Sequence, residues 1–526
     1  MSTTRHTSTE TVPAHHRVAV APRVFWPSAI VVTAFTVYAI VFRDTAARQA
    51  KTLQDNVIGG FGWYYILIVS LFVVFAIWLG LGRFGDITLG EDGEKAEYSI
   101  GAWLSMLFAA GMGIGLVFWG VAEPLFHYED PRPGVGSTPA QRADSAMVQT
   151  FLHWGIHPWA IYVVVGLAIA YSIHRKGRPV SIRWSLESIA GDKVRGWRGD
   201  VIDVVAVIGT VFGVATSLGL GVLQISAGLN HQGWLHEPGK GLQVTLVVAV
   251  TALATVSVVT GVDKGIKLLS QLNMGVAGAL MLFVLIVGPT LFIVDALVQN
   301  LGQYLQSLPR ISMYTGATEG PTGTAWTRQW TVFYWGWWIS WAPFVGVFIA
   351  RISRGRTVRE FVAGVLLVPT LLTFVWFAVF GGAGLHREMF GGGGLVGPDG
   401  PDRDSALFEL LNTLPGGSIT AGLAILVIVL FFVTSADSGA LVVNMLSSGG
   451  NPEPPTWSRA FWTTAQGAVA AALLVASGTG TAALTTLQTV AILIALPFSV
   501  VLLAMCVALV KTFRADHASS TPGRGS

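Results

Sequence analysis

The chain has 526 residues, of which 52% are hydrophobic and only 12% are charged, whereas about a quarter are charged in an ordinary soluble domain. This composition excludes a soluble protein. The formal net charge of +3 is small, and the basic residues lie between hydrophobic blocks, which excludes a nucleic-acid-binding surface. These blocks are about 20 residues long, the length that crosses a membrane as a helix. The sequence therefore predicts an all-α polytopic membrane protein.

The hydrophobic blocks follow one another along almost the whole chain and predict twelve transmembrane helices. The expected helices cover residues 24–43, 62–82, 98–121, 147–172, 201–229, 243–262, 269–294, 330–350, 361–382, 418–447, 458–477 and 484–510. After the seventh, residues 295–308 carry leucines at helical spacing, among them Leu297, Leu301 and Leu305. This pattern predicts an amphipathic helix that lies in the membrane interface.

The Lys and Arg residues indicate how these helices are oriented. If both termini are cytoplasmic, 22 of the 32 Lys and Arg residues lie in inner segments, and the positive-inside rule favours that orientation. We therefore expect a cytoplasmic N-terminal tail over 1–23, one multi-pass domain over 24–511 in the cell (inner) membrane, and a short cytoplasmic C-terminal tail over 512–526. Five helices from 98 to 294 and five from 330 to 510 suit an inverted repeat, because an odd number inverts the second copy.

Tryptophan gives the strongest functional signal, since the chain holds 19 and several lie deep within expected helices. Trp154, Trp159 and Tyr162 share one face of the fourth helix, and Trp154 lies about 11 Å below its outer end. Trp338 lies at a matching depth of about 12 Å in the eighth helix. Two aromatic faces near the middle of the membrane can enclose a quaternary ammonium, which aromatic rings hold by cation–π interaction. The alternative is that these rings only pack the core or form interfacial belts.

Glycines interrupt the third expected helix. Gly111, Gly113 and Gly115 lie within five residues, and each weakens a helix by about 1 kcal/mol. A break there exposes backbone groups that are tolerable only beside a cavity, where they can coordinate a cation or receive the anionic group of a solute. The alternative is close packing of two helices through small residues four positions apart, Gly111 and Gly115.

A polar cluster interrupts the tenth expected helix. Thr434 and Ser435 offer hydroxyl oxygens, which with carbonyls from the glycine break would form an oxygen shell for an alkali cation. Asp437, in the same cluster, is an intramembrane acid with either a functional or a structural role. His153 and His157 lie beside the aromatic residues of the fourth helix, where they suit either a proton relay or helix packing.

Other classes of function find no support in the sequence. No nucleophile–base pair, metal-ligand set or phosphate-binding loop stands out, and Cys506 is alone within the last hydrophobic block. We therefore expect neither an enzyme nor a bound cofactor. A sensor would need a sizeable signalling domain, and a channel would show uptake that does not saturate, so a carrier is the favoured class.

Several of these motifs resemble those of the betaine/choline/carnitine transporters, abbreviated BCCT. The run from Trp330 to Trp338 resembles the family signature, although Gln329 precedes it where a small residue or Asp is usual. Four further segments are similar to family sequence: ISWAPFVGVFIARISRGR, HWGIHPWAIY, AAGMGIG and FFVTSADSGA. The resemblance covers all twelve expected helices.

The resemblance implies a LeuT-like fold, in which helices three to seven and eight to twelve are inverted repeats preceded by two extra helices. It also implies a homotrimer that transports trimethylammonium or related compounds. The residues it places around the solute or its pathway are Trp154, Trp159, Tyr162, Trp338, Trp341, Trp335, Trp337, Phe118, Gly111, Gly113 and Gly115. The residues it places around the principal sodium ion are Ala109, Met112, Phe431, Thr434 and Ser435.

Two matches favour the sodium-coupled betaine carriers within the family. Gly115 stands where proton-coupled choline carriers have Asp, and residues 201–229 lack the Arg that replaces the metal in sodium-independent carnitine exchangers. A second sodium site in betaine carriers uses two hydroxyls one helical turn apart. Here Thr210 is followed one turn later by Val214, with Phe344 as a further candidate for that site.

The sequence thus predicts a secondary transporter that imports a trimethylammonium-type compatible solute, with glycine betaine favoured, by sodium symport and alternating access. The alternative is uptake of choline, carnitine, ectoine or dimethylsulfoniopropionate, with proton coupling as a further option, because a ring cage accepts several methylated onium heads. Three charged residues follow Lys511, so osmotic activation through a long charged C-terminal helix is not supported.

Overall fold

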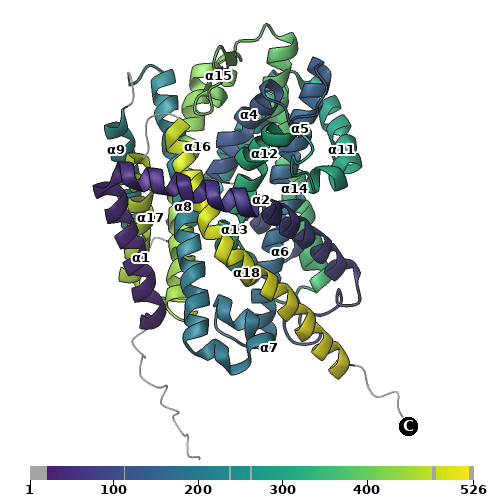
Figure 1. Ribbon diagram of the computed structural model, residues 1–526, viewed down its shortest axis with the longest axis vertical. Helices are drawn as coiled ribbons and strands as arrows, with labels where there is room; N and C mark the ends of the chain where they lie inside the picture. The colour runs from purple at the N-terminus through teal and green to yellow at the C-terminus, as the bar shows by residue number, and fades with distance from the viewer. Residues whose placement is uncertain (1–19, 112, 236–238, 261–262, 477–480, 521–526) are drawn as a thin grey trace, which may run out of the picture.

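The computed structural model describes residues 20–111, 113–235, 239–260, 263–476 and 481–520, which form a helical bundle (Figure 1). Its α-helices are α1 (Pro22–Val41), α2 (Arg43–Leu81), α3 (Ile100–Gly111), α4 (Ile114–Glu129), α5 (Pro139–Trp154), α6 (Ile156–Ala170), α7 (Glu187–Ala190), α8 (Trp197–His231), α9 (Lys240–Thr260), α10 (Asp263–Val287), α11 (Thr290–Ser312), α12 (Gly320–Thr327), α13 (Phe333–Arg351), α14 (Val358–Phe390), α15 (Ala406–Asn412), α16 (Gly417–Ser447), α17 (Thr456–Ala476) and α18 (Thr481–Ser520). Short π-helical or 3-10 segments are η1 (Tyr171–Arg175), η2 (Ile182–Leu186), η3 (Gly191–Arg195) and η4 (Arg328–Val332), and the two-residue strands β1 (Val396–Gly397) and β2 (Gly400–Pro401) pair antiparallel.

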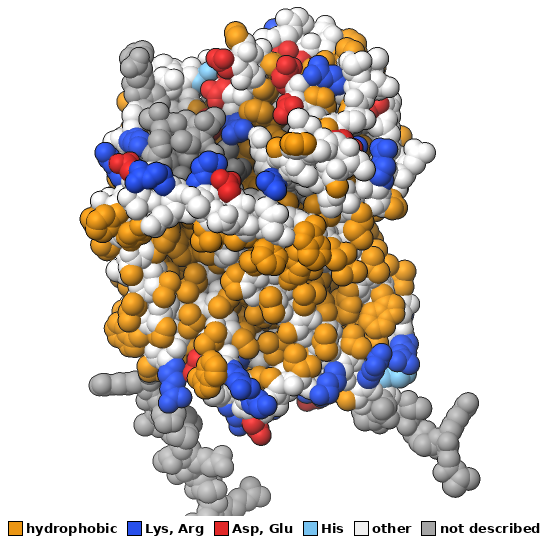
Figure 2. All heavy atoms as spheres, in the orientation of Figure 1, with side chains coloured by type: hydrophobic (Ala, Val, Ile, Leu, Met, Phe, Trp, Pro, Cys, Tyr) orange, Lys and Arg blue, Asp and Glu red, His pale blue; other side chains and the backbone are white. Residues whose placement is uncertain are grey.

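The exterior of the bundle is suited to a lipid bilayer. Within the described ranges, ten helices are long and apolar enough to cross a membrane. Figure 2 shows hydrophobic side chains forming a broad band across the molecule, with Lys and Arg gathered along its lower edge. Helices satisfy their own backbone hydrogen bonds, which is the condition for spanning hydrocarbon. The chain is therefore a polytopic all-α membrane protein, as the sequence predicts.

The count of twelve transmembrane helices stays a prediction, because two of the expected helices are not among these ten. The third, over 98–121, is divided into α3 and α4, which have 12 and 16 residues and are each shorter than a usual span. The eleventh corresponds to α17, whose 21 residues are long enough but include the polar residues Arg459 and Gln466.

The glycine run breaks the third expected helix at the predicted place. α3 ends at Gly111, α4 begins at Ile114, and Gly113 between them is extended, with φ −161° and ψ −176°. Side chains from neighbouring helices bond to the first turn of α4. The Trp376 indole N–H donates to the Leu116 carbonyl at 2.9 Å, and the Gln224 amide donates to the Val117 carbonyl at 3.2 Å. These bonds hold the start of α4 inside the bundle.

The fourth expected helix is also broken, which the prediction of one continuous helix over 147–172 missed. α5 ends at Trp154 and α6 begins at Ile156. A Cβ on Gly155 would lie 2.4 Å from the Phe151 carbonyl oxygen and 2.8 Å from the Phe374 ring. A larger residue at this junction would have to displace the Phe151 carbonyl or the Phe374 ring, which explains the glycine.

Three further boundaries differ from the prediction. α2 has 39 residues and begins at Arg43, well before the expected start at residue 62, and Figure 1 shows it lying across the front of the bundle. α10 ends at Val287 rather than at residue 294, because Gly288 and Pro289 interrupt the chain. α11 then covers the expected amphipathic segment and packs against α5 and α14.

The C-terminal helix α18 continues beyond residue 511, where the sequence analysis places the start of the tail. The Asp516 carboxylate accepts from Arg175 Nε at 2.6 Å and from Lys176 Nζ at 3.1 Å. These contacts join the last turns of α18 to the end of η1, the π-helical segment that follows α6. In Figure 1, the beginning of α1 and the end of α18 lie on the same side of the bundle.

Asp437 takes part in an ion pair that joins two helices of the bundle. Its carboxylate lies 2.8 Å from Arg459 Nη2, and the two side chains are 5% and 17% exposed. The structure therefore gives this intramembrane acid of α16 a structural partner on α17. Removing one member of a buried pair leaves the other charge uncompensated, which costs several kcal/mol.

We expect Asp437→Ala to lower the free energy of unfolding by about 3 kcal/mol, because Arg459 then keeps its charge without this carboxylate. The measurement is the thermal unfolding temperature of the purified protein in detergent. Asp55→Ala is the control, since Asp55 pairs with Lys51 at 3.6 Å where both side chains are more than half exposed. An Asp437→Ala protein as stable as this control would contradict a structural role for the pair.

Candidate functional site

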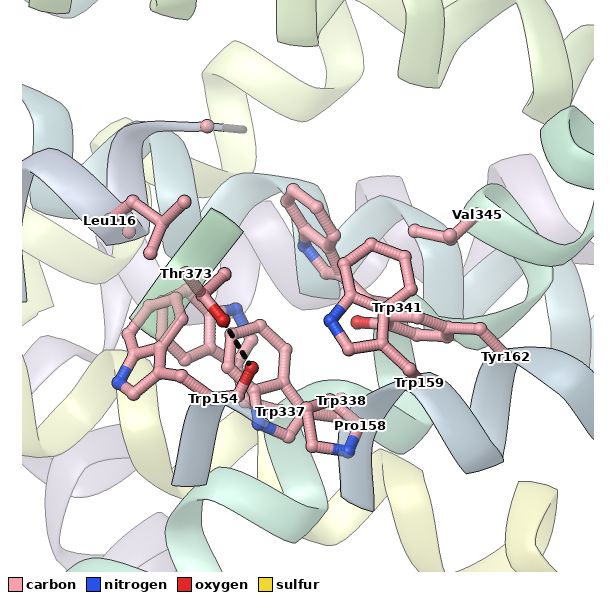
Figure 3. Close-up of a pocket in the computed structure, with 12 residues that line it drawn as sticks. Leu116, Trp154, Pro158, Trp159, Tyr162, Trp337, Trp338, Trp341, Val345 and Thr373 are labelled. Atoms are coloured by element: carbon pink, nitrogen blue, oxygen red, sulfur yellow. Dashed lines mark hydrogen bonds between the residues drawn. The ribbon is translucent and has the colours of Figure 1, made fainter. Parts of the chain in front are cut away.

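An aromatic cavity lies where α4, α5, α6, α13 and α14 meet (Figure 3). Its side chains surround about 450 Å³ of space that atoms do not fill, space open to solvent included. Its lining residues are Gly113, Gly115, Leu116, Trp154, Pro158, Trp159, Tyr162, Trp337, Trp338, Trp341, Val345 and Thr373. We call this space the aromatic cavity.

The predicted aromatic faces meet in this cavity. Trp154 of α5 and Trp338 of α13 pack edge to face, with ring centroids 4.9 Å apart and an interplanar angle of 71°. Trp159 and Tyr162 of α6 pack edge to face as well, at 5.3 Å and 80°. Trp337 stacks on Trp338 at 4.6 Å. All five rings are buried, so none of them faces lipid.

Hydrogen bonds fix the two indoles that join α5 to α13. Trp154 Nε1 donates to Glu123 Oε2 at 2.6 Å, and Trp338 Nε1 donates to the His153 carbonyl at 2.9 Å. The Thr373 hydroxyl donates to the Trp154 carbonyl at 3.1 Å, as the dashed line in Figure 3 shows. The rings around the cavity are thus held in place before a solute arrives.

The glycine break supplies the remaining wall. A Cβ on Gly115 would lie 2.8 Å from Trp337 and 2.9 Å from Trp154, so this position lets two indoles approach the backbone closely. Gly113 caps the N-terminus of α4, and both glycines line the cavity. The N-terminus of a helix carries free N–H groups and partial positive charge, which favour an anionic group. The cavity therefore combines aromatic rings with the N-terminal end of α4.

Two of the predicted aromatic residues lie apart from this cavity. Trp335 stacks on His157, with centroids 5.1 Å apart and an interplanar angle of 16°, and Phe118 packs against Trp119 at 5.1 Å. Neither is among the described residues that line the aromatic cavity. His157 is fully buried in this stack, an arrangement that fits the packing interpretation of this histidine.

A second cavity lies beside the first. Its lining residues are Ser270, Met274, Trp341, Phe344, Val345, Phe348, Phe431, Thr434, Ser435 and Ser438. The cavity thus brings together the three α16 residues of the predicted sodium site with Phe344. Trp341 and Val345 line both cavities, so the two share a wall formed by α13. We call this space the hydroxyl cavity.

The hydroxyl cavity has oxygen atoms that suit an alkali cation. The Thr434 hydroxyl donates to the Leu430 carbonyl at 2.9 Å, which leaves its oxygen lone pairs available as acceptors. None of the described residues of the glycine break, which opens after Gly111 at the end of α3, lines the hydroxyl cavity. Met112 and the Ala109 side chain, the other two predicted ligands, lie outside the described part of the chain.

The residues proposed for a second sodium site are not brought together. Thr210 is buried in α8, and its hydroxyl donates to the Ala206 carbonyl at 2.9 Å. Phe344 lines the hydroxyl cavity, but Thr210 is absent from the described residues that surround that cavity. Thr216 and Ser217 also direct their hydroxyls to carbonyls of α8 one turn earlier.

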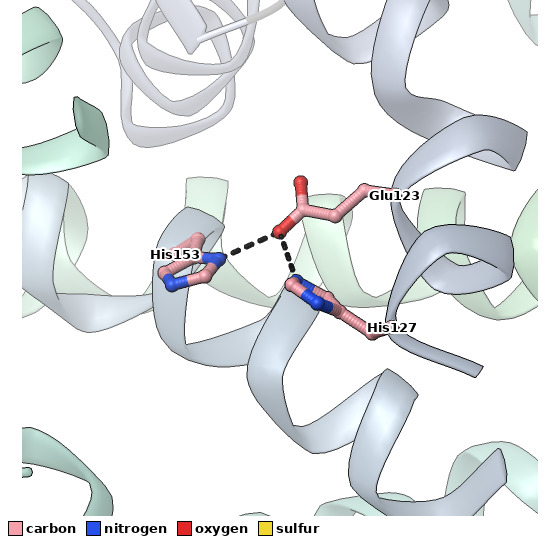
Figure 4. Close-up of side chains that lie close together, drawn as sticks. All are labelled: Glu123, His127 and His153. Atoms are coloured by element: carbon pink, nitrogen blue, oxygen red, sulfur yellow. Dashed lines mark hydrogen bonds and ion pairs between the residues drawn. The ribbon is translucent and has the colours of Figure 1, made fainter. Parts of the chain in front are cut away.

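A buried carboxylate behind the aromatic cavity is a feature that the sequence analysis missed. Glu123 of α4 lies between His127 and His153, with its Oε1 3.3 Å from His127 Nε2 and 2.7 Å from His153 Nδ1 (Figure 4). Possible ligand atoms of the three residues lie within 4.8 Å of one another, so these residues could hold a metal ion. An acidic residue inside an apolar run is the sequence signal that could have drawn attention to it.

A family model described as BCCT, betaine/carnitine/choline family transporter, matches residues 23–518. A protein named as an uncharacterized transporter of Mycobacterium tuberculosis (strain H37Rv) is 51% identical over 505 residues, which cover 95% of this chain and 84% of the relative. Glycine betaine transporter 1 of Vibrio parahaemolyticus and glycine betaine transporter OpuD of Bacillus subtilis are each 43% identical over 94% of both chains.

The match between the family model and this chain extends from the first helix to the last, and the named relatives are transporters rather than enzymes. With the membrane-spanning helices, the match makes the protein a multi-pass membrane transporter. The chain therefore belongs to the betaine/carnitine/choline transporter family.

Proposed function

We propose that this protein imports glycine betaine or a close trimethylammonium analogue by sodium symport. The observation that carries the proposal is the aromatic cavity, in which buried rings from α5, α6 and α13 surround one small space. The names of the relatives from Vibrio parahaemolyticus and Bacillus subtilis support glycine betaine as the solute. Family membership supports transport of an onium compound in general.

The chemistry of a quaternary ammonium suits this cavity. Such a group has no N–H to donate, so aromatic faces and apolar contact are what can hold it. Each ring face contributes up to about 2 kcal/mol when desolvated, and three faces give about 6 kcal/mol. Micromolar binding needs about 8 kcal/mol. Burial of the methyl groups against the indoles would supply the rest.

The carboxylate of a zwitterionic solute has a matching partner at the glycine break. Gly113 and Gly115 lie at the start of α4, and both line the aromatic cavity. The N–H groups at this helix end favour an anion. A solute with a cationic head and a carboxylate one carbon away would span the distance from rings to backbone.

Sodium would bind in the hydroxyl cavity and supply the driving force. One sodium ion entering at 100 mV contributes about 2.3 kcal/mol, enough for about 50-fold accumulation. The wall shared by the two cavities supports coupling, because an ion that orders Thr434 and Ser435 would also constrain Trp341. Alternating access would follow from rocking of the first-repeat bundle in a LeuT-like inverted repeat.

The same proposal includes the cellular setting that the sequence predicts. Both termini would lie in the cytoplasm, in agreement with the ends of the described chain on one side of the bundle (Figure 1). The protein would reside in the cell (inner) membrane as a homotrimer and serve osmoprotection. Choline, carnitine, ectoine and dimethylsulfoniopropionate remain alternative solutes, because each carries a methylated or delocalised onium head.

We expect Trp338→Ala to abolish saturable uptake of labelled glycine betaine in reconstituted vesicles, because the α13 face of the cage is lost. Trp338→Phe keeps an aromatic face and should retain part of the uptake. The control is Trp197→Ala, since Trp197 is 68% exposed at the start of α8. Undiminished uptake by Trp338→Ala would contradict the cage.

Gly115→Ala should raise the KM for glycine betaine by about tenfold or more, because the added methyl would displace Trp337 or Trp154 from the cavity wall. Initial rates of uptake over a range of solute concentrations give the KM. Gly101→Ala is the matched control, because a methyl on this α3 glycine meets nothing within 4 Å. Equal KM values for the two variants would show that the close approach has no role.

Thr434→Ala with Ser435→Ala should raise the sodium concentration for half-maximal uptake about tenfold, because two oxygen ligands are removed. The matched control is Thr255→Ala, since the Thr255 hydroxyl also donates to a carbonyl one turn earlier, at 2.8 Å. An unchanged sodium curve would contradict the ion site. Uptake that follows an imposed pH gradient without sodium would favour proton coupling instead.

A further inference from the structure

The carboxylate of Glu123 lies at the N–H edge of the Trp154 indole. It is fully buried, and its two oxygens have different neighbours. Oε1 faces His153 and His127, and Oε2 accepts from Trp154 Nε1 at 2.6 Å and from the Tyr334 hydroxyl. One acid of α4 thus meets α5 and α13, the two helices whose indoles join in the aromatic cavity.

The contacts of Glu123 indicate that its negative charge has a role beyond helix packing. Burying a carboxylate is expensive, and an uncharged side chain of the same size could accept the same indole N–H. A metal ion at Oε1 would account for the two histidines, but it would leave unexplained why two ring donors converge on Oε2. The contacts therefore connect the carboxylate to the aromatic rings.

A carboxylate at the N–H edge of an indole acts on whatever lies over its face. The hydrogen bond draws electron density toward the ring, which strengthens the attraction between the ring quadrupole and a cation. The negative charge also attracts the cation through space. A cation over the Trp154 face would lie about 7 Å from the carboxylate, near enough to change binding by about tenfold or more.

We propose that Glu123 makes the aromatic cavity selective for a positively charged head over a neutral head of the same shape. This inference rests on the proposed function, since it assumes that an onium solute occupies the cavity. Glu123 acts as a positioning residue through Trp154 and does not line the cavity among the described residues. Glu123 then determines the selectivity for charge, whereas the rings that line the cavity determine the selectivity for shape.

The test compares glycine betaine with its carbon isostere, 3,3-dimethylbutanoate, in which a neutral carbon replaces the ammonium nitrogen. Both carry the same carboxylate, so its interactions cancel in the ratio of the two affinities. Binding is measured by tryptophan fluorescence of the purified full-length protein, which requires no transport. We expect the wild-type protein to prefer glycine betaine.

Glu123→Gln should reduce this preference about tenfold. The glutamine carbonyl can still accept from Trp154 Nε1, so the ring keeps its orientation while the charge is removed. Glu409→Gln is the matched control, because Glu409 is a half-buried glutamate of α15 whose Oε1 accepts from Ser405 and which is not among the residues of the cavity. Equal losses of affinity for both compounds in Glu123→Gln would mean a purely structural role and would overturn the inference.

A second variant tests the effect of the Glu123 charge if Glu123→Gln fails to fold. Tyr334→Phe keeps the ring and the carboxylate but removes one donor from Oε2, which leaves more of the charge to Trp154. The preference for glycine betaine should then rise, and an unchanged or smaller ratio would contradict the inference. A wild-type protein that binds neither compound would instead refute the proposed function, and the inference with it.

Discussion

The edge-to-face contact between Trp154 and Trp338 joins α5 to α13, and the aromatic cavity depends on it. Gly155 ends α5 directly after Trp154, and the extended Gly113 ends the helical path before α4. The absence of a side chain at Gly115 then leaves room for the indoles. Two local helix breaks, each costing some intrinsic helix stability, create the space in which the rings gather.

The shared wall gives the two cavities a physical connection. α13 contributes Trp337 and Trp338 to the aromatic cavity and Phe344 and Phe348 to the hydroxyl cavity, while Trp341 and Val345 line both. If a cation and a solute each order this helix, the first to bind carries the loss of conformational entropy and the second binds without it. This is the basis of positive coupling between two sites. The same helix packs against α6, α8 and α18, so its position is set by several elements of the bundle.

Much of the fold could be predicted from hydrophobic blocks alone, because lipid requires long apolar helices. Counting residues inward from the expected helix ends predicted that Trp154 and Trp338 could meet, and their rings are in contact, although α5 begins at Pro139 rather than at residue 147. The glycine break was predicted from composition. The break at Gly155 could not be predicted, since a single glycine is tolerated in most helices and Phe374, which excludes a side chain there, is more than 200 residues away.

The partners of buried polar groups are the least predictable part of the site. Glu123 receives donors from residues about 30 and 211 positions away, which no local pattern reveals. The indoles differ in the same way: those of Trp154 and Trp338 have protein acceptors, whereas Trp337 Nε1 and Trp341 Nε1 have none among the described residues. A buried N–H without an acceptor costs about 1–3 kcal/mol. Trp337 and Trp341 both line the aromatic cavity, so an acceptor group of a solute would relieve that cost wherever it reached these N–H groups.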